Sequence, residues 1–192
     1  MDDAVNDKAG ADAANRYGHY ALPRDSSDVI GWVRQHGHEH GFELDPAQNA
    51  ALRHFQRLYE DLIALERMEA SLIGLLARKQ TVPGVYLWGG VGRGKSFLMD
   101  SFFNCAPLAR KQRVHFHRFM QEVHRALNRH QGVEDPLAII AREIAKDTRL
   151  ICLDEFHITD ITDAMLMRRL LEGLFECGVV LVPTSNLHPD EL

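Results

Sequence analysis

The 192-residue chain lacks long apolar runs, paired cysteines and any overall excess of basic residues. No stretch approaches the roughly 18 consecutive apolar residues that a membrane-spanning helix needs. The cysteines are widely spaced, odd in number and outside any C-x-x-C pair, being Cys105, Cys152 and Cys177. This argues against a disulfide framework or a zinc site and suits a reducing compartment. The first residues also lack the basic and apolar regions of a secretory signal, so we expect a cytoplasmic protein.

The formal net charge of −5 is carried by one end of the chain. Residues 1–45 contain nine acidic and four basic residues, whereas the remainder contains 18 of each sign. The larger part of the chain therefore has no excess positive charge with which to bind nucleic acid or an anionic membrane, and we expect neither as a partner. A chain of 192 residues with 45% hydrophobic residues is ample for a globular core.

Composition and periodicity divide the chain into three predicted segments. Residues 1–25 are small, polar and acidic, which predicts a flexible tail. Residues 26–81 have the apolar spacing of helices, and residues 82–192 alternate short apolar runs with helical patterns. We therefore expect an acidic tail, an N-terminal helical segment and an α/β domain.

The helical segment begins with a short apolar patch at residues 29–33, which predicts one helix. A second helix is predicted from Asp45, which reads as an N-cap followed by Pro46 in the first turn. Gln48 occupies the capping-box position. The apolar pattern after it is longer than most globular helices, so we expect a break near residues 67–71.

Four short apolar runs in the α/β domain are typical of a parallel sheet with crossover helices. The runs are residues 85–88, 114–117, 150–153 and 179–182. Helices are expected to begin near Lys95, Phe119, Pro136 and Ile161. Polar residues at the carboxyl ends of these strands are then the candidates for a ligand site.

The segment after the first run carries a phosphate-binding motif. It fits the pattern G-x-x-x-x-G-K-[ST] with Gly89, Gly90, Val91, Gly92, Arg93, Gly94, Lys95 and Ser96. Glycines let backbone N–H groups approach phosphate oxygens closely, and the helix after them points its positive end at the same anion. We expect Lys95 to reach the β- and γ-phosphates of a nucleotide and Ser96 to ligate Mg²⁺.

Two carboxylates, Asp154 and Glu155, follow the third apolar run. In a parallel sheet this position faces the ligand crevice, so Asp154 should lie beside the phosphate loop. There it can hold Mg²⁺ through water, as the Walker B aspartate of P-loop NTPases does. Glu155 is placed to orient and deprotonate the attacking water. A strand that simply ends in solvent-facing acids is the structural alternative.

Asn186 follows the fourth apolar run, within the sequence Thr184-Ser185-Asn186. At this strand end a polar side chain could touch the γ-phosphate or the attacking water. Ordinary turn chemistry is the alternative, because serine and asparagine are common in turns.

Two further polar patterns have structural interpretations. His115 and His117 share one face of the second predicted strand, but no carboxylate or cysteine completes a metal set, so we assign them to structure or partner contact. The basic cluster before that strand is interpreted as a solvated edge and consists of Arg110, Lys111 and Arg113.

Several blocks in this order resemble the AFG-like family of AAA+ P-loop ATPases, which includes bacterial cell-division ATPases. The blocks are GVYLWGGVGRGKSFLMDSFF, RVHFHRFMQEVHRAL, LICLDEFHITDITDAM and LVPTSNLHPDEL. The resemblance covers about residues 42–192 and extends well beyond the phosphate loop, because the second and third blocks are not general NTPase features.

The resemblance implies an AAA+ fold with sheet order 5-1-4-3-2 and ATP with Mg²⁺ as the ligand. It implies ATP hydrolysis with Lys95, Glu155 and Asn186 as catalytic residues, Asn186 in the sensor-1 role. It also implies ring-shaped homo-oligomers in which a neighbour's arginine completes the site. Bacterial members are linked to the division-ring protein FtsZ, which becomes a candidate partner.

Two departures from the family pattern bear on this expectation. Pro183 removes a backbone donor from a predicted interior strand. Family members continue through an arginine finger, a fifth strand, sensor 2 and a helical lid, so we expect residues 82–192 to form a partial AAA+ domain with residues 85–88 as an edge strand. A nucleotide-binding interaction module, or a truncated fragment without significant ATPase activity, is therefore the alternative. A GTPase is disfavoured because no N-K-x-D motif occurs.

Overall fold

The computed structural model describes residues 28–40, 43–70 and 81–191. The predicted tail at residues 1–25 lies outside these described residues. Within them, none of the helices combines the length and the apolar character needed to cross a bilayer.

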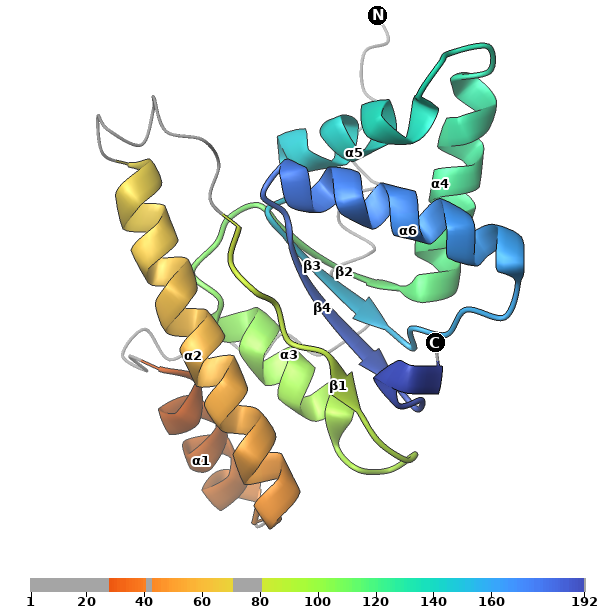
Figure 1. The fold of residues 1–192 in the computed structure, drawn as a ribbon. Helices are drawn as coiled ribbons and strands as arrows, with labels where there is room; N and C mark the ends of the chain where they lie inside the picture. Colours follow the sequence, from red (N-terminus) through yellow and green to blue (C-terminus); the bar gives the residue numbers. More distant parts are fainter. Residues whose placement is uncertain (1–27, 41–42, 71–80, 192) are drawn as a thin grey trace, which may run out of the picture.

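A parallel sheet of four strands forms the centre of the described structure (Figure 1). The strands are β1 (Leu87–Trp88), β2 (Lys111–His115), β3 (Leu150–Asp154) and β4 (Val180–Ser185). Their order is β1-β4-β3-β2, as expected for these four strands of the family sheet. In the described part of the chain β1 and β2 are the edges, so β3 and β4 are interior strands.

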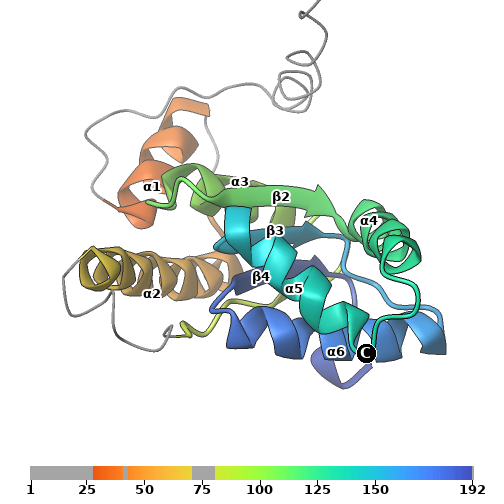
Figure 2. The same cartoon turned by 90° about the horizontal axis from the view of Figure 1, so that it is seen from above.

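Helices cover both faces of this sheet (Figures 1 and 2). On one face lies α3 (Lys95–Cys105), with α1 (Val29–His40) and α2 (Pro46–Glu69) packed against it. The other face is covered by α4 (Phe116–Arg129), α5 (Pro136–Asp147) and α6 (Ile161–Glu176). A short 3₁₀ turn, η1 (Pro189–Glu191), follows β4. The predicted α/β fold class is confirmed as a three-layer arrangement.

Strand β3 separates two hydrophobic cores because its successive side chains point to opposite faces. Leu150 and Cys152 belong to the core that contains α1, α2 and α3, whereas Ile151 and Leu153 belong to the core that contains α4, α5 and α6. All four are fully buried, which explains the continuous apolar run. The same alternation places Asp154, the last residue of β3, on the α3 face of the sheet.

Helix α2 begins as the sequence predicts. The Asp45 carboxylate accepts a hydrogen bond from the Gln48 backbone N–H at 2.8 Å, and Gln48 Oε1 accepts one from the Asp45 N–H at 2.9 Å. These reciprocal bonds complete the predicted capping box, with Pro46 in the first turn. The helix ends at Glu69, within the predicted break.

The predicted boundary between the second strand and its helix is wrong. β2 spans Lys111–His115, and α4 begins at Phe116 instead of near Phe119. The buried apolar side chains of this helix recur at helical spacing, which overrides the short apparent alternation in the sequence, and they include Phe116, Phe119, Met120 and Val123. His115 and His117 consequently do not share a strand face, because His115 ends β2 and His117 lies in α4.

Pro183 lies inside β4, where its missing N–H affects the pairing with β1. The Thr184 carbonyl accepts from Phe156 N beyond β3, at 2.7 Å, whereas the Ser185 carbonyl accepts from Gly89 N on the β1 side, at 3.2 Å. The backbone N–H and C=O groups of successive residues in a strand point to opposite sides, so the backbone nitrogen of Pro183, like the carbonyl of Ser185, faces β1. The β1–β4 ladder has two residue pairs and the β3–β4 ladder has four. The proline therefore weakens the edge pairing and leaves the interior pairing intact.

Gly84→Ala is expected to destabilise the fold by about 1–3 kcal/mol, the usual cost of overpacking. A Cβ at residue 84 would overlap the backbone carbonyl of Leu181 in β4, which cannot move aside as a side chain could. Gly90→Ala is the matched control, because nothing lies within 4 Å of a Cβ there. Thermal unfolding should show a lower Tm for Gly84→Ala than for Gly90→Ala. Equal Tm values for the two variants would contradict the close approach of the backbone at Gly84 to Leu181 of β4.

Candidate functional site

The loop between β1 and α3 is shaped by glycines in left-handed backbone. Gly89, Gly92 and Gly94 have φ angles of 146°, 77° and 76°, a region that other L residues rarely adopt. Gly94 is the N-cap of α3, and its carbonyl accepts the helical bond from Leu98 N at 3.0 Å. The first-turn N–H groups of α3 therefore face the loop and form an end of the helix that favours anions.

Lys95 directs its ammonium group into this loop. Nζ donates to the carbonyl oxygens of Gly89 at 2.6 Å and Gly90 at 2.8 Å, and to Asn186 Oδ1 at 2.9 Å. Asn186 follows β4, so the ends of β1 and β4 meet at this ammonium group. Burial lowers the pKa of Lys95, and the negative charge of Asp154 opposes that shift.

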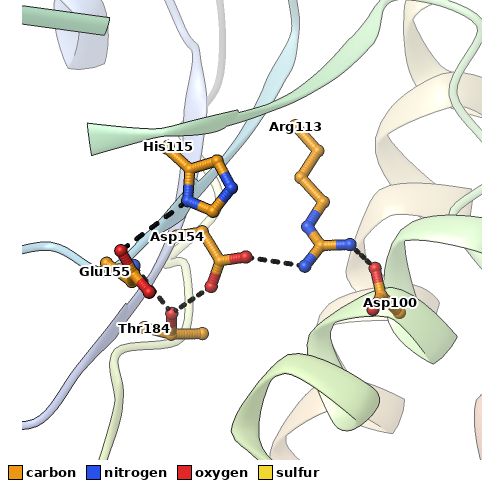
Figure 3. Close-up of polar contacts among 6 residues, drawn as sticks. All are labelled: Asp100, Arg113, His115, Asp154, Glu155 and Thr184. Carbon is orange, nitrogen blue, oxygen red and sulfur yellow. Dashed lines mark hydrogen bonds and ion pairs between the residues drawn. The ribbon is translucent and has the colours of Figure 1, made fainter. Parts of the chain in front are cut away.

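Asp154 ends β3 with both carboxylate oxygens bound (Figure 3). Oδ1 accepts a hydrogen bond from the Thr184 hydroxyl at 2.9 Å, and Oδ2 accepts one from the Arg113 guanidinium at 2.7 Å. Arg113 also forms an ion pair with Asp100 of α3. The Asp154 side chain is only 8% exposed. A buried carboxylate needs such partners, and they hold it in one orientation.

Glu155 adopts a left-handed backbone with φ 56°, which is unusual for a residue other than glycine. Its N–H donates to Thr184 Oγ1 at 3.2 Å, so one hydroxyl group contacts both the Glu155 backbone and the Asp154 carboxylate. The Glu155 side chain is 80% exposed, and its Oε2 lies 3.9 Å from His115 Nδ1 (Figure 3). The carboxylate thus projects from the sheet next to the buried Asp154.

The remaining residues of the predicted phosphate loop differ in their surroundings. Val91 and Ser96 are exposed, Val91 in the loop and Ser96 in the first turn of α3. The Arg93 carbonyl accepts a hydrogen bond from Gln48 Nε2 at 3.2 Å, so the capped end of α2 contacts the loop. The fold therefore places Lys95 in direct contact with both the glycine loop and Asn186. Ser96, in contrast, faces solvent.

The interpretation of the basic cluster as a solvated edge is wrong for two of its three members. Lys111 Nζ donates to the carbonyl oxygens of Phe103 at 2.6 Å and Ala106 at 2.9 Å, where a cation suits the C-terminal end of α3. Arg113 is 14% exposed and bonded to Asp154. Only Arg110 is exposed, as predicted.

Arg113 and Thr184 are the two contacts of Asp154 that sequence reasoning did not assign to the site. Arg113 pairs in register with Cys152 of β3, so it shares the α3 face with Asp154. Correct bounds for β2 would have placed Arg113 in this strand, since the predicted strand began one residue after it, but the pairing with Cys152 also requires the β2–β3 register. Thr184 is buried inside β4, where the sequence suggested a turn or a ligand contact.

The donors at this end of the sheet fit Mg²⁺. Ser96 and Asp154 supply a hydroxyl and a carboxylate, both of which are hard oxygen ligands. The described ranges contain no group of three or more His, Cys, Asp or Glu side chains that could form an all-protein metal cage. Mg²⁺ in nucleotide sites usually takes one or two protein oxygens and completes its shell with phosphates and water, so a sparse donor set is appropriate.

The sheet order, the glycine loop leading into Lys95 and the carboxylate that ends β3 define a P-loop protein of the AAA+ type. A solved structure agrees: AMPPCP-bound DnaA from Aquifex aeolicus matches with a TM-score of 0.55 and 18% identity, over 80% of this chain and 43% of that chain. This likeness is one of fold. The family model of the AFG1-like ATPases matches residues 32–192, and the chain belongs to that family.

Named relatives are similar over much of this chain. It is 45% identical to the Escherichia coli cell division protein ZapE over 166 residues, which is 80% of this chain and 44% of that protein. It is 47% identical to zebrafish (Danio rerio) lactation elevated protein 1 homolog B over 120 residues, which is 57% of this chain and 24% of that protein. The chain therefore spans less than half the length of these two relatives.

Proposed function

We propose that this chain binds ATP with Mg²⁺ and hydrolyses it, with residues 89–96 as the phosphate loop. The observation that carries the proposal is the position of the Lys95 ammonium group. It lies among oxygen atoms of Gly89, Gly90 and Asn186, at the N-terminal end of α3. A cation held by neutral oxygens next to a helix N-terminus is suited to exchange those oxygens for phosphate oxygens.

Ser96 and Asp154 are the residues that would hold Mg²⁺, whose chemistry here is charge neutralisation at the β- and γ-phosphate oxygens. Ser96 is exposed in the first turn of α3, so its hydroxyl is accessible to a metal ion. Asp154 is fixed by Thr184 and Arg113, and each of its oxygens keeps a second lone pair for a metal-bound water.

Glu155 is proposed to orient the attacking water and accept its proton. Its side chain is exposed and follows Asp154 directly, so the carboxylate can reach water beside the metal-holding residue. The bond from Glu155 N–H to Thr184 fixes the backbone from which this carboxylate projects. Asn186, which contacts Lys95, would position the water or the γ-phosphate.

The cellular role is proposed by analogy with the named relatives. The cell division name of the E. coli relative supports a role in cell division. The division-ring protein FtsZ, which the family resemblance implies as a partner, is the proposed partner to test. We further propose a cytoplasmic homo-oligomer in which an arginine from a neighbouring copy completes the site.

Phosphate release by the purified chain tests the proposed hydrolysis. The expected result is steady release from ATP in the presence of Mg²⁺ and none after Mg²⁺ is removed with EDTA. Nucleotide binding without any release would instead identify a nucleotide-binding interaction module, and absence of both binding and release by a folded chain would contradict the proposal.

A further inference from the structure

Arg113 joins three elements of the candidate site through two carboxylates. Its guanidinium bonds Asp154 Oδ2 at 2.7 Å and forms an ion pair with Asp100 (Figure 3). Arg113 belongs to β2, Asp154 to β3 and Asp100 to α3. Because α3 begins with Lys95 and Ser96, the guanidinium connects the helix that carries the phosphate-binding residues to the strand that carries Asp154.

Burial makes this connection stiff. The Arg113 side chain is 14% exposed and that of Asp154 8% exposed, whereas Asp100 is 35% exposed. A planar guanidinium can hold two carboxylates at once in fixed directions, which a lysine ammonium on a flexible stem cannot do. Removing one member of a buried charge pair leaves the other without compensation, so the pair resists separation.

The direction of the bonds matters for the metal. The Asp154 carboxylate is oriented from one side by the Thr184 hydroxyl and from the other by Arg113, while its charge also acts on Lys95. Thr184 anchors Asp154 to β4, within the sheet. Arg113 contacts both Asp154 and α3, so it sets where this carboxylate lies relative to Ser96.

We propose that Arg113 is a positioning residue for Mg²⁺ binding, which acts by fixing Asp154 relative to α3, with Asp100 orienting the guanidinium. The proposal rests on the proposed function, since it concerns the same Mg²⁺–ATP site. Arg113 touches neither nucleotide nor metal in this scheme. Its effect is therefore on the affinity for Mg²⁺ and not on the binding of ATP itself.

Titration of Mg²⁺ into the full chain with a saturating fluorescent ATP analogue tests this proposal. Arg113→Gln should weaken the apparent Mg²⁺ affinity by about tenfold or more, a usual effect of removing a partner of a metal ligand. The affinity for the analogue without Mg²⁺ should stay within about threefold of wild type. Arg113→Lys should have an apparent Mg²⁺ affinity between those of wild type and Arg113→Gln, because lysine keeps the positive charge but cannot hold both carboxylates in fixed directions.

Asp100→Asn is a second variant, and it keeps the buried pair of Arg113 and Asp154. It allows the proposal to be tested even if Arg113→Gln does not fold. It should weaken Mg²⁺ affinity in the same direction by a smaller factor. Arg168→Gln is the matched control, because Arg168 is an 82% exposed residue of α6 that pairs only on the surface with Glu172. It should leave Mg²⁺ affinity unchanged.

Unchanged Mg²⁺ affinity in folded Arg113→Gln and Asp100→Asn would overturn the proposal and leave the proposed function standing. An increased affinity would also overturn it, since Arg113 would then compete with the metal for Asp154. Failure of the wild-type chain to bind the ATP analogue at all would overturn the proposed function and this proposal with it.

Discussion

Lys95→Ala should lose measurable ATP binding, with affinity reduced by at least about 100-fold. Hydrogen bonds to charged groups contribute about 1.5–3 kcal/mol each, and the ammonium group is expected to form more than one with the phosphates. In the structure the group is already directed into the glycine loop, where it bonds Gly89, Gly90 and Asn186. Isothermal titration calorimetry with Mg²⁺–ATP would measure the loss.

Two controls separate loss of binding from loss of fold. Lys146→Ala removes the same charge from an exposed position on α5 and should bind ATP like wild type. Circular dichroism should show the same helix content in both variants. Equal ATP affinity of wild type and Lys95→Ala would contradict the assignment of residues 89–96 as the phosphate loop.

Glu155→Gln should bind ATP as tightly as wild type and lose hydrolysis by about 10²–10⁴-fold, the usual contribution of a general base. Glutamine has the shape of glutamate and keeps the backbone N–H that bonds Thr184, so the left-handed backbone at this position should persist. What is lost is the carboxylate that accepts a proton. Phosphate release and ATP binding, measured on the same preparation, give the two readouts.

The control for Glu155→Gln is the same substitution at a glutamate that has no proposed role in hydrolysis. Glu122 of α4 is 51% exposed and pairs with Arg118 one helical turn away, so Glu122→Gln removes a similar charge at the surface. Its hydrolysis rate should match wild type. If Glu155→Gln releases phosphate as fast as Glu122→Gln, Glu155 is not the base.

Local sequence signals were sufficient for the loop, the strand core and the capped helix. The glycine pattern before Lys95 and Ser96 specifies backbone conformations that few other residues adopt, and these appear at Gly89, Gly92 and Gly94. The apolar runs at residues 150–153 and 179–182 lie within β3 and β4 apart from the first residue of the second run. Such features depend on neighbours in sequence, so a single chain reveals them.

The contacts around Asp154 depend on register between distant strands. Arg113 reaches this carboxylate only because β2 pairs with β3 in a particular register, and Thr184 only because β4 lies on the other side of β3. Neither the basic cluster nor the Thr-Ser-Asn sequence contains that information. The left-handed backbone of Glu155 likewise has no local signal, because it follows from tertiary contacts with Thr184 and β4.

Backbone NMR of the 192-residue chain titrated with a non-hydrolysable ATP analogue and Mg²⁺ tests the central claim most directly, because it locates the ligand. The amide signals of residues 89–96 should shift saturably, together with those of Asp154 and Asn186. Unshifted signals across residues 89–96 in a folded chain, or shifts confined to another part of the surface, would contradict the central claim.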